Sequence, residues 1–316
     1  MLPMFPAHPE SLHGLFTETN PLAKYFRANI RLFNSGMAMA SVMVTEKTVL
    51  SHGPASFKVC GQMHRLIGPM LQQNDSTPPT CMQTYFHDPE YQAAHRANRN
   101  ARGNISQNDI DKRTAIFHTL HRIIAEDCHN SYLQSFLSVN EYIQREGINP
   151  EEVQIQLCAT ERPQDGHHAG RYHLPTALEV ALLKDVNPPV GAHRSIVCSV
   201  RQRQLTNDDR KDLKRFQDYH RSYTPLTYPL LFPHGTDGWT LGIRSLSSTP
   251  QDKNVTIMSW LRFHMMARPT HFNFLHSARK LYQQYIVDEF ERHHTSDMGW
   301  MVHNQKTLRA DLCRGL

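Results

Sequence analysis

The chain has 316 residues, of which 39% are hydrophobic and 20% charged, and it carries a net charge of +5. This composition is sufficient for a folded core and argues against wholesale disorder, while the mild positive charge fits either a polyanionic partner or a solvated surface. The six cysteines lie far apart without Cys-x-x-Cys spacing, which is untypical of a secreted disulfide scaffold. The first residues do not resemble a signal peptide, and no apolar run approaches the roughly 20 residues that span a bilayer. We therefore expect a soluble, intracellular protein with reduced thiols and no membrane partner.

The first third of the chain predicts a mostly β region. Residues 1–21 are rich in Pro and His and are expected to form a loop, followed by a helix from Leu22 to Phe33 that ends at Asn34-Ser35-Gly36. Residues 90–104 are polar and rich in Arg and Asn, which fits either a helix or a flexible connector. Short apolar segments predict strands at residues 37–44, 57–60, 63–67 and 81–86.

The middle of the chain predicts two capped helices and then further strands. Ser106 and Asp109 match a helix start, and Ser131 with Gln134 matches a second start, for a helix that Gly147 ends. The short connector predicts that these two helices form an antiparallel hairpin. Strands are expected at residues 153–158 and 195–201, with a helix or strand at 176–183 and a charged segment at 206–216.

Residues 220–239 form the segment around which we expect the fold to be organised. Pro225, Pro229 and Pro233 fix the backbone and remove hydrogen-bond donors, which predicts a rigid ribbon rather than a regular helix. The apolar run between the last two prolines predicts burial. The residues that we take as the structural signature of this ribbon, because they define its sequence pattern, are His220, Tyr223, Pro229, Leu231, Phe232, Pro233, Gly238 and Trp239.

Two helices are predicted to close the chain, at residues 257–267 and 272–292. In the second helix, one face is apolar, while Arg279, Lys280 and Asp288 fall on the other side. The sequence as a whole predicts an α+β protein with antiparallel sheet segments, packed helices and a helical C-terminal end. We expect three regions: a mostly β region at 1–104, an α+β region with the ribbon at 105–250, and a helical region at 251–316.

Several ordered blocks resemble the N-terminal region of Helitron transposases, rolling-circle transposable elements whose protein joins a nuclease to a helicase. The ribbon, YHRSYTPLTYPLLFPHGTDGW, closely resembles a family signature, and FRANIRLFNSGMAMASV and KLYQQYIVDEFER are similar to further segments. The resemblance spans nearly the whole chain. It implies a truncated or separately encoded helicase-like part of the transposase, located in the nucleus, whose partners are DNA and the nuclease and helicase domains of the same family.

The catalytic motifs of that family are absent from the sequence. No two of the 21 histidines are separated by a single residue, so the nuclease's metal-binding His pair is missing. No Gly-Lys dipeptide occurs, so the helicase's phosphate-binding loop is missing as well. We therefore expect no catalytic residue, cofactor, metal or small-molecule substrate. His118 and His121 are a weak alternative, a possible metal pair of an independent enzyme.

DNA binding is the function that the residues favour, because flexible cations beside a groove are sufficient to contact phosphates. For each candidate basic residue, the simpler alternative is a solvated position on the protein surface without a DNA contact. Tyr219, Tyr223 and Trp239 could stack on bases, although burial is favoured for Trp239. The candidate phosphate contacts are Arg201, Arg203, Lys211, Lys214, Arg215, Arg279 and Lys280.

Two functional hypotheses therefore follow. The first is a non-catalytic module that binds and positions DNA for rolling-circle transposition. The second is a structural bracing or protein-interaction module, or a decayed remnant, without DNA binding. An exposed hydrophobic surface on the C-terminal helices would favour the second hypothesis, because a missing partner leaves such a patch.

Overall fold

A computed structural model describes residues 2, 4–46, 59–74, 76–99, 105–157, 180–183, 196–201, 214–215, 219–244, 254–268, 272–305 and 307. The chain adopts an α+β fold, as predicted. Its helical segments, with η1 a 3₁₀ helix and η2 a π turn, are α1 (Glu10–Thr17), α2 (Pro21–Ala28), α3 (Ile30–Met37), η1 (Cys81–Phe86), α4 (Pro89–Arg99), α5 (Gln107–Arg122), η2 (Ile123–Asp127), α6 (Ser131–Arg145), α7 (Tyr223–Thr227), α8 (Ile257–Met265), α9 (Phe274–Ser277) and α10 (Lys280–His303).

The strands of the described residues form two antiparallel three-stranded sheets. One sheet has the order β1-β2-β6 and the other the order β4-β3-β5. The amide of Leu71, which follows the first sheet, donates to the carbonyl oxygen of Val200 beside the second sheet and so links the two. The strands are β1 (Ser41–Glu46), β2 (Val59–Ile67), β3 (Gln154–Leu157), β4 (Val180–Leu183), β5 (Ile196–Ser199) and β6 (Lys214–Arg215).

Several predictions for the first third were wrong. The expected N-terminal loop contains α1, which has no side-chain cap and is held in place by burying Leu12, Leu15 and Phe16. The predicted strand at 81–86 is the 3₁₀ helix η1, because Thr80 and Gln83 form a capping box. The two short strands expected at 57–60 and 63–67 are one strand, β2.

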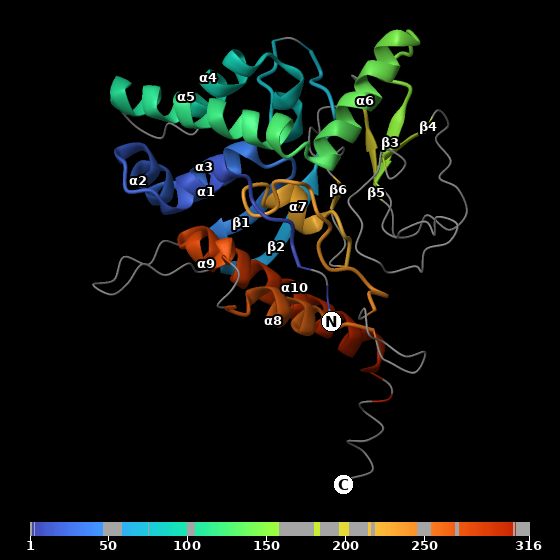
Figure 1. Cartoon of the computed structure of the whole chain (residues 1–316). Helices are drawn as coiled ribbons and strands as arrows, with labels where there is room; N and C mark the ends of the chain where they lie inside the picture. The colour runs from blue at the N-terminus through green and yellow to red at the C-terminus, as the bar shows by residue number, and fades with distance from the viewer. Residues whose placement is uncertain are drawn as a thin grey trace.

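Helix packing also differs from the expected pairing. α5 begins after Ser106, whose hydroxyl accepts from the Asp109 amide, as predicted. Its antiparallel neighbour is α4 rather than α6. Figure 1 shows α4 and α5 side by side at one end of the molecule, α8 and α10 at the opposite end, and α7 between them. The polar segment at 90–104 is therefore helical as far as Arg99.

The ribbon at 220–239 lies at the centre of this arrangement and is buried, as predicted. It is not helix-free, however, because α7 forms one turn within it. Pro225 is the third residue of α7, where a backbone amide has no partner inside the helix, so the proline is tolerated. At Gly238, a Cβ atom would lie 2.7 Å from the Thr224 hydroxyl oxygen, so close packing requires glycine there.

Hydrogen bonds from distant segments hold the ribbon in place. The Asn34 amide group on α3 donates to the Thr227 carbonyl at 2.9 Å. Ahead of α6, the Asn130 amide group donates to the Pro233 carbonyl at 2.9 Å. The indole of Trp239 donates to the Val255 carbonyl at 2.9 Å. The ribbon therefore links the N-terminal, middle and C-terminal parts of the chain.

Helix α10 contributes carboxylates to the interior, and this was not predicted. Asp288, expected on the exposed face, is fully buried and accepts hydrogen bonds from the hydroxyls of Tyr223 and Tyr228, both at 2.9 Å. The predicted continuous helix at 272–292 is also broken, because Arg279 adopts a φ of 49° between α9 and α10. Hydrogen bonding to the Asp288 carboxylate satisfies both buried phenols.

A buried ion pair lies beside Asp288. The Arg292 guanidinium donates to the Glu289 carboxylate at 3.0 Å and to the Trp239 carbonyl at 2.8 Å. Glu289 also accepts from the Thr224 hydroxyl at 2.8 Å. Burial raises the pKa of Glu289, and Arg292 opposes this shift by stabilising the carboxylate. Each partner therefore depends on the other for its charge to be tolerated.

Acid should destabilise the fold through His220 at the start of the ribbon. Burial, with Arg221 and Arg292 nearby, lowers the pKa of His220 to about 3, compared with 6.5 for a free histidine. As the pH falls, the unfolded chain therefore binds a proton at His220 before the folded chain does. The contribution of the neutral His220 to the free energy of unfolding is present above about pH 6.5 and is lost progressively as the pH falls toward about 3. We expect His220 to account for a loss of about 2 kcal/mol in unfolding free energy between about pH 7 and pH 5.

Urea unfolding of the wild type and of His220→Gln at both pH values measures this contribution. The variant should have the shallower pH dependence by about that amount. His118→Gln, at an exposed position on α5, is the control and should retain the wild-type dependence. Equal pH dependence in all three proteins would contradict a neutral, buried His220.

Candidate functional site

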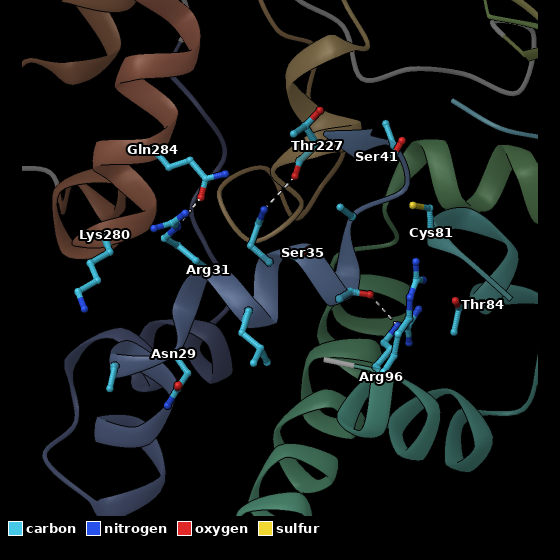
Figure 2. A pocket seen from close by; sticks show the side chains of 17 residues that line it. Asn29, Arg31, Ser35, Ser41, Cys81, Thr84, Arg96, Thr227, Lys280 and Gln284 are labelled. Atoms are coloured by element: carbon cyan, nitrogen blue, oxygen red, sulfur yellow. Dashed lines mark hydrogen bonds between the residues drawn. The ribbon is translucent and has the colours of Figure 1, made fainter. Parts of the chain in front are cut away.

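A cleft of about 890 Å³ lies where three separate parts of the chain meet. α3 forms its floor, η1 and the end of α4 form one side, and the first turns of α10 form the other. Figure 2 shows Arg31 and Lys280 on one side of the cleft, and Arg96 on the opposite side with Cys81 and Thr84. The cleft is thus built from segments that are distant in the sequence, such as those of Arg31 and Gln284, which are 253 residues apart.

The described lining of the cleft is basic and polar. Among the described residues that line it, no Asp or Glu occurs. The four cations are Arg31, Arg96, Arg99 and Lys280, and the neutral polar side chains are Asn29, Asn34, Ser35, Ser41, Thr84, Thr227 and Gln284. Walls of a single charge sign concentrate the electric field inside a cleft and attract counter-ions of the opposite sign.

Arg96 is the most unusual of these cations because it is only 2% exposed. Its Nε donates to the Gly36 carbonyl at 2.9 Å, and one terminal nitrogen donates to Gln92 at 2.8 Å. The second terminal nitrogen, Nη2, has no hydrogen-bond partner in the described part of the protein. A buried guanidinium without a carboxylate partner is costly, and an anion in the cleft would compensate it.

Tyr85 and Cys81, two described residues near Arg96, do not supply this negative charge. Its guanidinium lies 4.4 Å from the centre of the Tyr85 ring, which gives a cation–π contact. Burial raises the pKa of Tyr85 to about 12, so the phenol stays protonated and donates to the Met37 carbonyl. Burial likewise raises the pKa of the Cys81 thiol, so this side chain is not a thiolate at neutral pH.

The other three cations are more accessible. Arg31 is half-buried, and its Nε donates to Gln284 at 2.9 Å, a hydrogen bond that joins α3 to α10 across the cleft. Arg99 and Lys280 are exposed, at the end of α4 and the start of α10 respectively. This arrangement combines the buried Arg96 with the half-buried Arg31, which Gln284 holds, and with two exposed cations, Arg99 and Lys280, whose side chains can follow an extended anion.

The sequence-predicted phosphate contacts are only partly brought together. Lys280 lines the cleft, whereas the exposed Arg279 and the half-buried Arg201 do not. Lys214 and Arg215 form β6, which pairs with β2, but their side chains are not among those that the structure describes. Arg203 and Lys211 lie outside the described residues. The arginine-rich tract at 90–104 was the available sequence signal for Arg96 and Arg99.

Other candidate groups are placed elsewhere. Tyr223 and Trp239 are buried, which excludes base stacking by Tyr223 and confirms the burial of Trp239. His121 is half-buried, and burial lowers its pKa to about 4, while His118 is exposed. Within the residues that the structure describes, no group of three metal-binding side chains occurs.

No model of a known protein family matches the chain, and no curated protein matches it. Among the described residues, no helix combines the length and apolarity needed to cross a bilayer.

Proposed function

We propose that the chain is a non-catalytic DNA-binding module of a Helitron-type transposase, and that the basic cleft holds phosphates of the DNA backbone. The observation that carries this proposal is a cleft whose described lining holds four cations and no carboxylate, and in which Nη2 of the buried Arg96 has no hydrogen-bond partner among the described residues. The resemblance of the ribbon and its flanking blocks to the Helitron N-terminal region supplies the biological context. In that context the module acts in the nucleus and positions DNA for the nuclease and helicase domains of the same family.

Fluorescence anisotropy with labelled single- and double-stranded DNA across a salt series tests the proposal. Four phosphate contacts predict a slope of log K against log salt of about −3. Affinity should therefore fall about 60-fold between about 50 and about 200 mM salt. Absence of binding to either form of DNA at the lower salt concentration would refute the proposal.

A protein-interaction role is the second candidate, and one surface favours it. The last four turns of α10 carry a group of exposed hydrophobic side chains, between 44% and 64% accessible. The members of this group are Phe290, Met298, Trp300, Met301 and Val302. Exposed apolar clusters typically contact a partner. A negative result in the DNA titration would favour this bracing role over DNA binding.

A further inference from the structure

A second hollow, of about 660 Å³, adjoins the basic cleft along α4. It is lined by the loop at residues 76–78 and by Tyr91, His95, Asn98 and Arg99. Arg99 lines both hollows, so a cation of the cleft is also part of this second site. A ligand that places an anion at Arg99 therefore has a neighbouring surface on which to place another group.

Two of the side chains that line this hollow, Tyr91 and His95, carry aromatic rings. Tyr91 is 42% exposed, and its ring lies nearly parallel to that of His95, with an interplanar angle of 8° and centroids 5.7 Å apart. The two residues are four apart on α4, which places them on the same face of the helix. The His95 ring is fixed because its Nε2 donates to the Pro79 carbonyl at 2.9 Å. Burial lowers the pKa of His95, which keeps the ring neutral.

We propose that the Tyr91–His95 ring pair is a nucleobase-stacking site, where an unpaired base of a DNA strand packs while a neighbouring phosphate lies at Arg99. This inference rests on the proposed function and adds a base contact to the phosphate contacts of the cleft. Tyr91 and Arg99 are eight residues apart on one helix, about 12 Å along its axis. The Asn98 amide group, in the same hollow, donates one N–H to the Ala94 carbonyl at 2.9 Å and presents its second N–H and its oxygen to the edge of the base. Aromatic rings beside a basic groove are the usual means of holding single-stranded nucleic acid.

Anisotropy titration of Tyr91→Ala and Tyr91→Phe tests the stacking site. The probes are a labelled oligothymidylate and a strand of equal length with abasic positions. With the base-bearing strand, Tyr91→Ala should bind about 5- to 100-fold more weakly than the wild type, and Tyr91→Phe should bind nearly as tightly. With the abasic strand, all three proteins should bind alike, and the salt slope should be the same for each.

The controls separate this inference from the proposal on which it rests. Tyr142→Ala removes a tyrosine of similar exposure from α6 and should not change binding. Tight binding of the base-bearing strand by both the wild type and Tyr91→Ala would overturn the stacking site and leave the phosphate cleft standing. If the wild type binds no DNA at low salt, the cleft proposal fails, and the stacking site fails with it.

Discussion

Replacing Arg292 with Met is expected to lower the free energy of unfolding by about 3–5 kcal/mol, because it leaves the Glu289 carboxylate buried without its cation. The substitution also removes the donor to the Trp239 carbonyl. It further removes a guanidinium that lies 4.6 Å from the centre of the Tyr223 ring. Urea denaturation followed by tryptophan fluorescence measures the loss as a lower midpoint at unchanged slope.

Two companion variants separate the effect of burial from that of charge. Arg145→Met breaks an ion pair to Glu146 that is exposed on the surface, and it should cost less than about 1 kcal/mol. Adding Glu289→Gln to Arg292→Met removes the isolated charge and should restore a large part of the loss. Since a protonated Glu289 needs no cation, the deficit of Arg292→Met should also be smaller at pH 5 than at pH 8. Equal costs for Arg292→Met and Arg145→Met would contradict a buried ion pair.

Removing the three accessible cations of the cleft is expected to weaken DNA binding about 100- to 1000-fold at about 50 mM salt. The variant combines Arg31→Gln, Arg99→Gln and Lys280→Gln and leaves the buried Arg96 in place. Each lost phosphate contact removes its counterion release, so the salt slope should fall in magnitude by about 2. Anisotropy across the salt series measures both quantities.

A matched variant distinguishes the cleft from general positive charge. Lys24→Gln, Arg122→Gln and Arg145→Gln remove the same charge from exposed positions that do not line the cleft. This control should bind DNA nearly as tightly as the wild type. Equal losses in the two triple variants would show that binding depends on net charge alone and not on the cleft.

The ribbon shows how far the sequence could predict the fold. Its apolar run was sufficient to predict burial, because hydrophobicity is a property of the local sequence. The burial of Asp288 was not predictable from periodicity, which assigned it to the exposed face of its helix. Its partners Tyr223 and Tyr228 lie 65 and 60 residues away, so only the tertiary structure brings the phenols to the carboxylate.

The cleft was less predictable than the ribbon for the same reason. Of its four cations, only Lys280 was among the candidate phosphate contacts, because charge clustering along the chain favoured the segment around Lys211. Arg31 lies in α3, a segment whose apolar pattern predicted a helix and gave no signal of a phosphate contact. Charges that are distant in sequence become a site only when helices pack, and no local spacing encodes that packing.

The ribbon's hydrogen bonds also bear on the order in which the chain folds. One of these bonds joins the ribbon to α3 across 193 residues of sequence. Another joins it to the start of α6 across 103 residues, and a third joins it to α10 across 65 residues. Contacts of such long range slow folding, because many residues must be ordered before these contacts form. During synthesis, the hydroxyls of Tyr223 and Tyr228 have no carboxylate to bind until Asp288 has left the ribosome. Closure of the core is therefore a late event, and until then the partly made chain exposes apolar surface that a chaperone would bind.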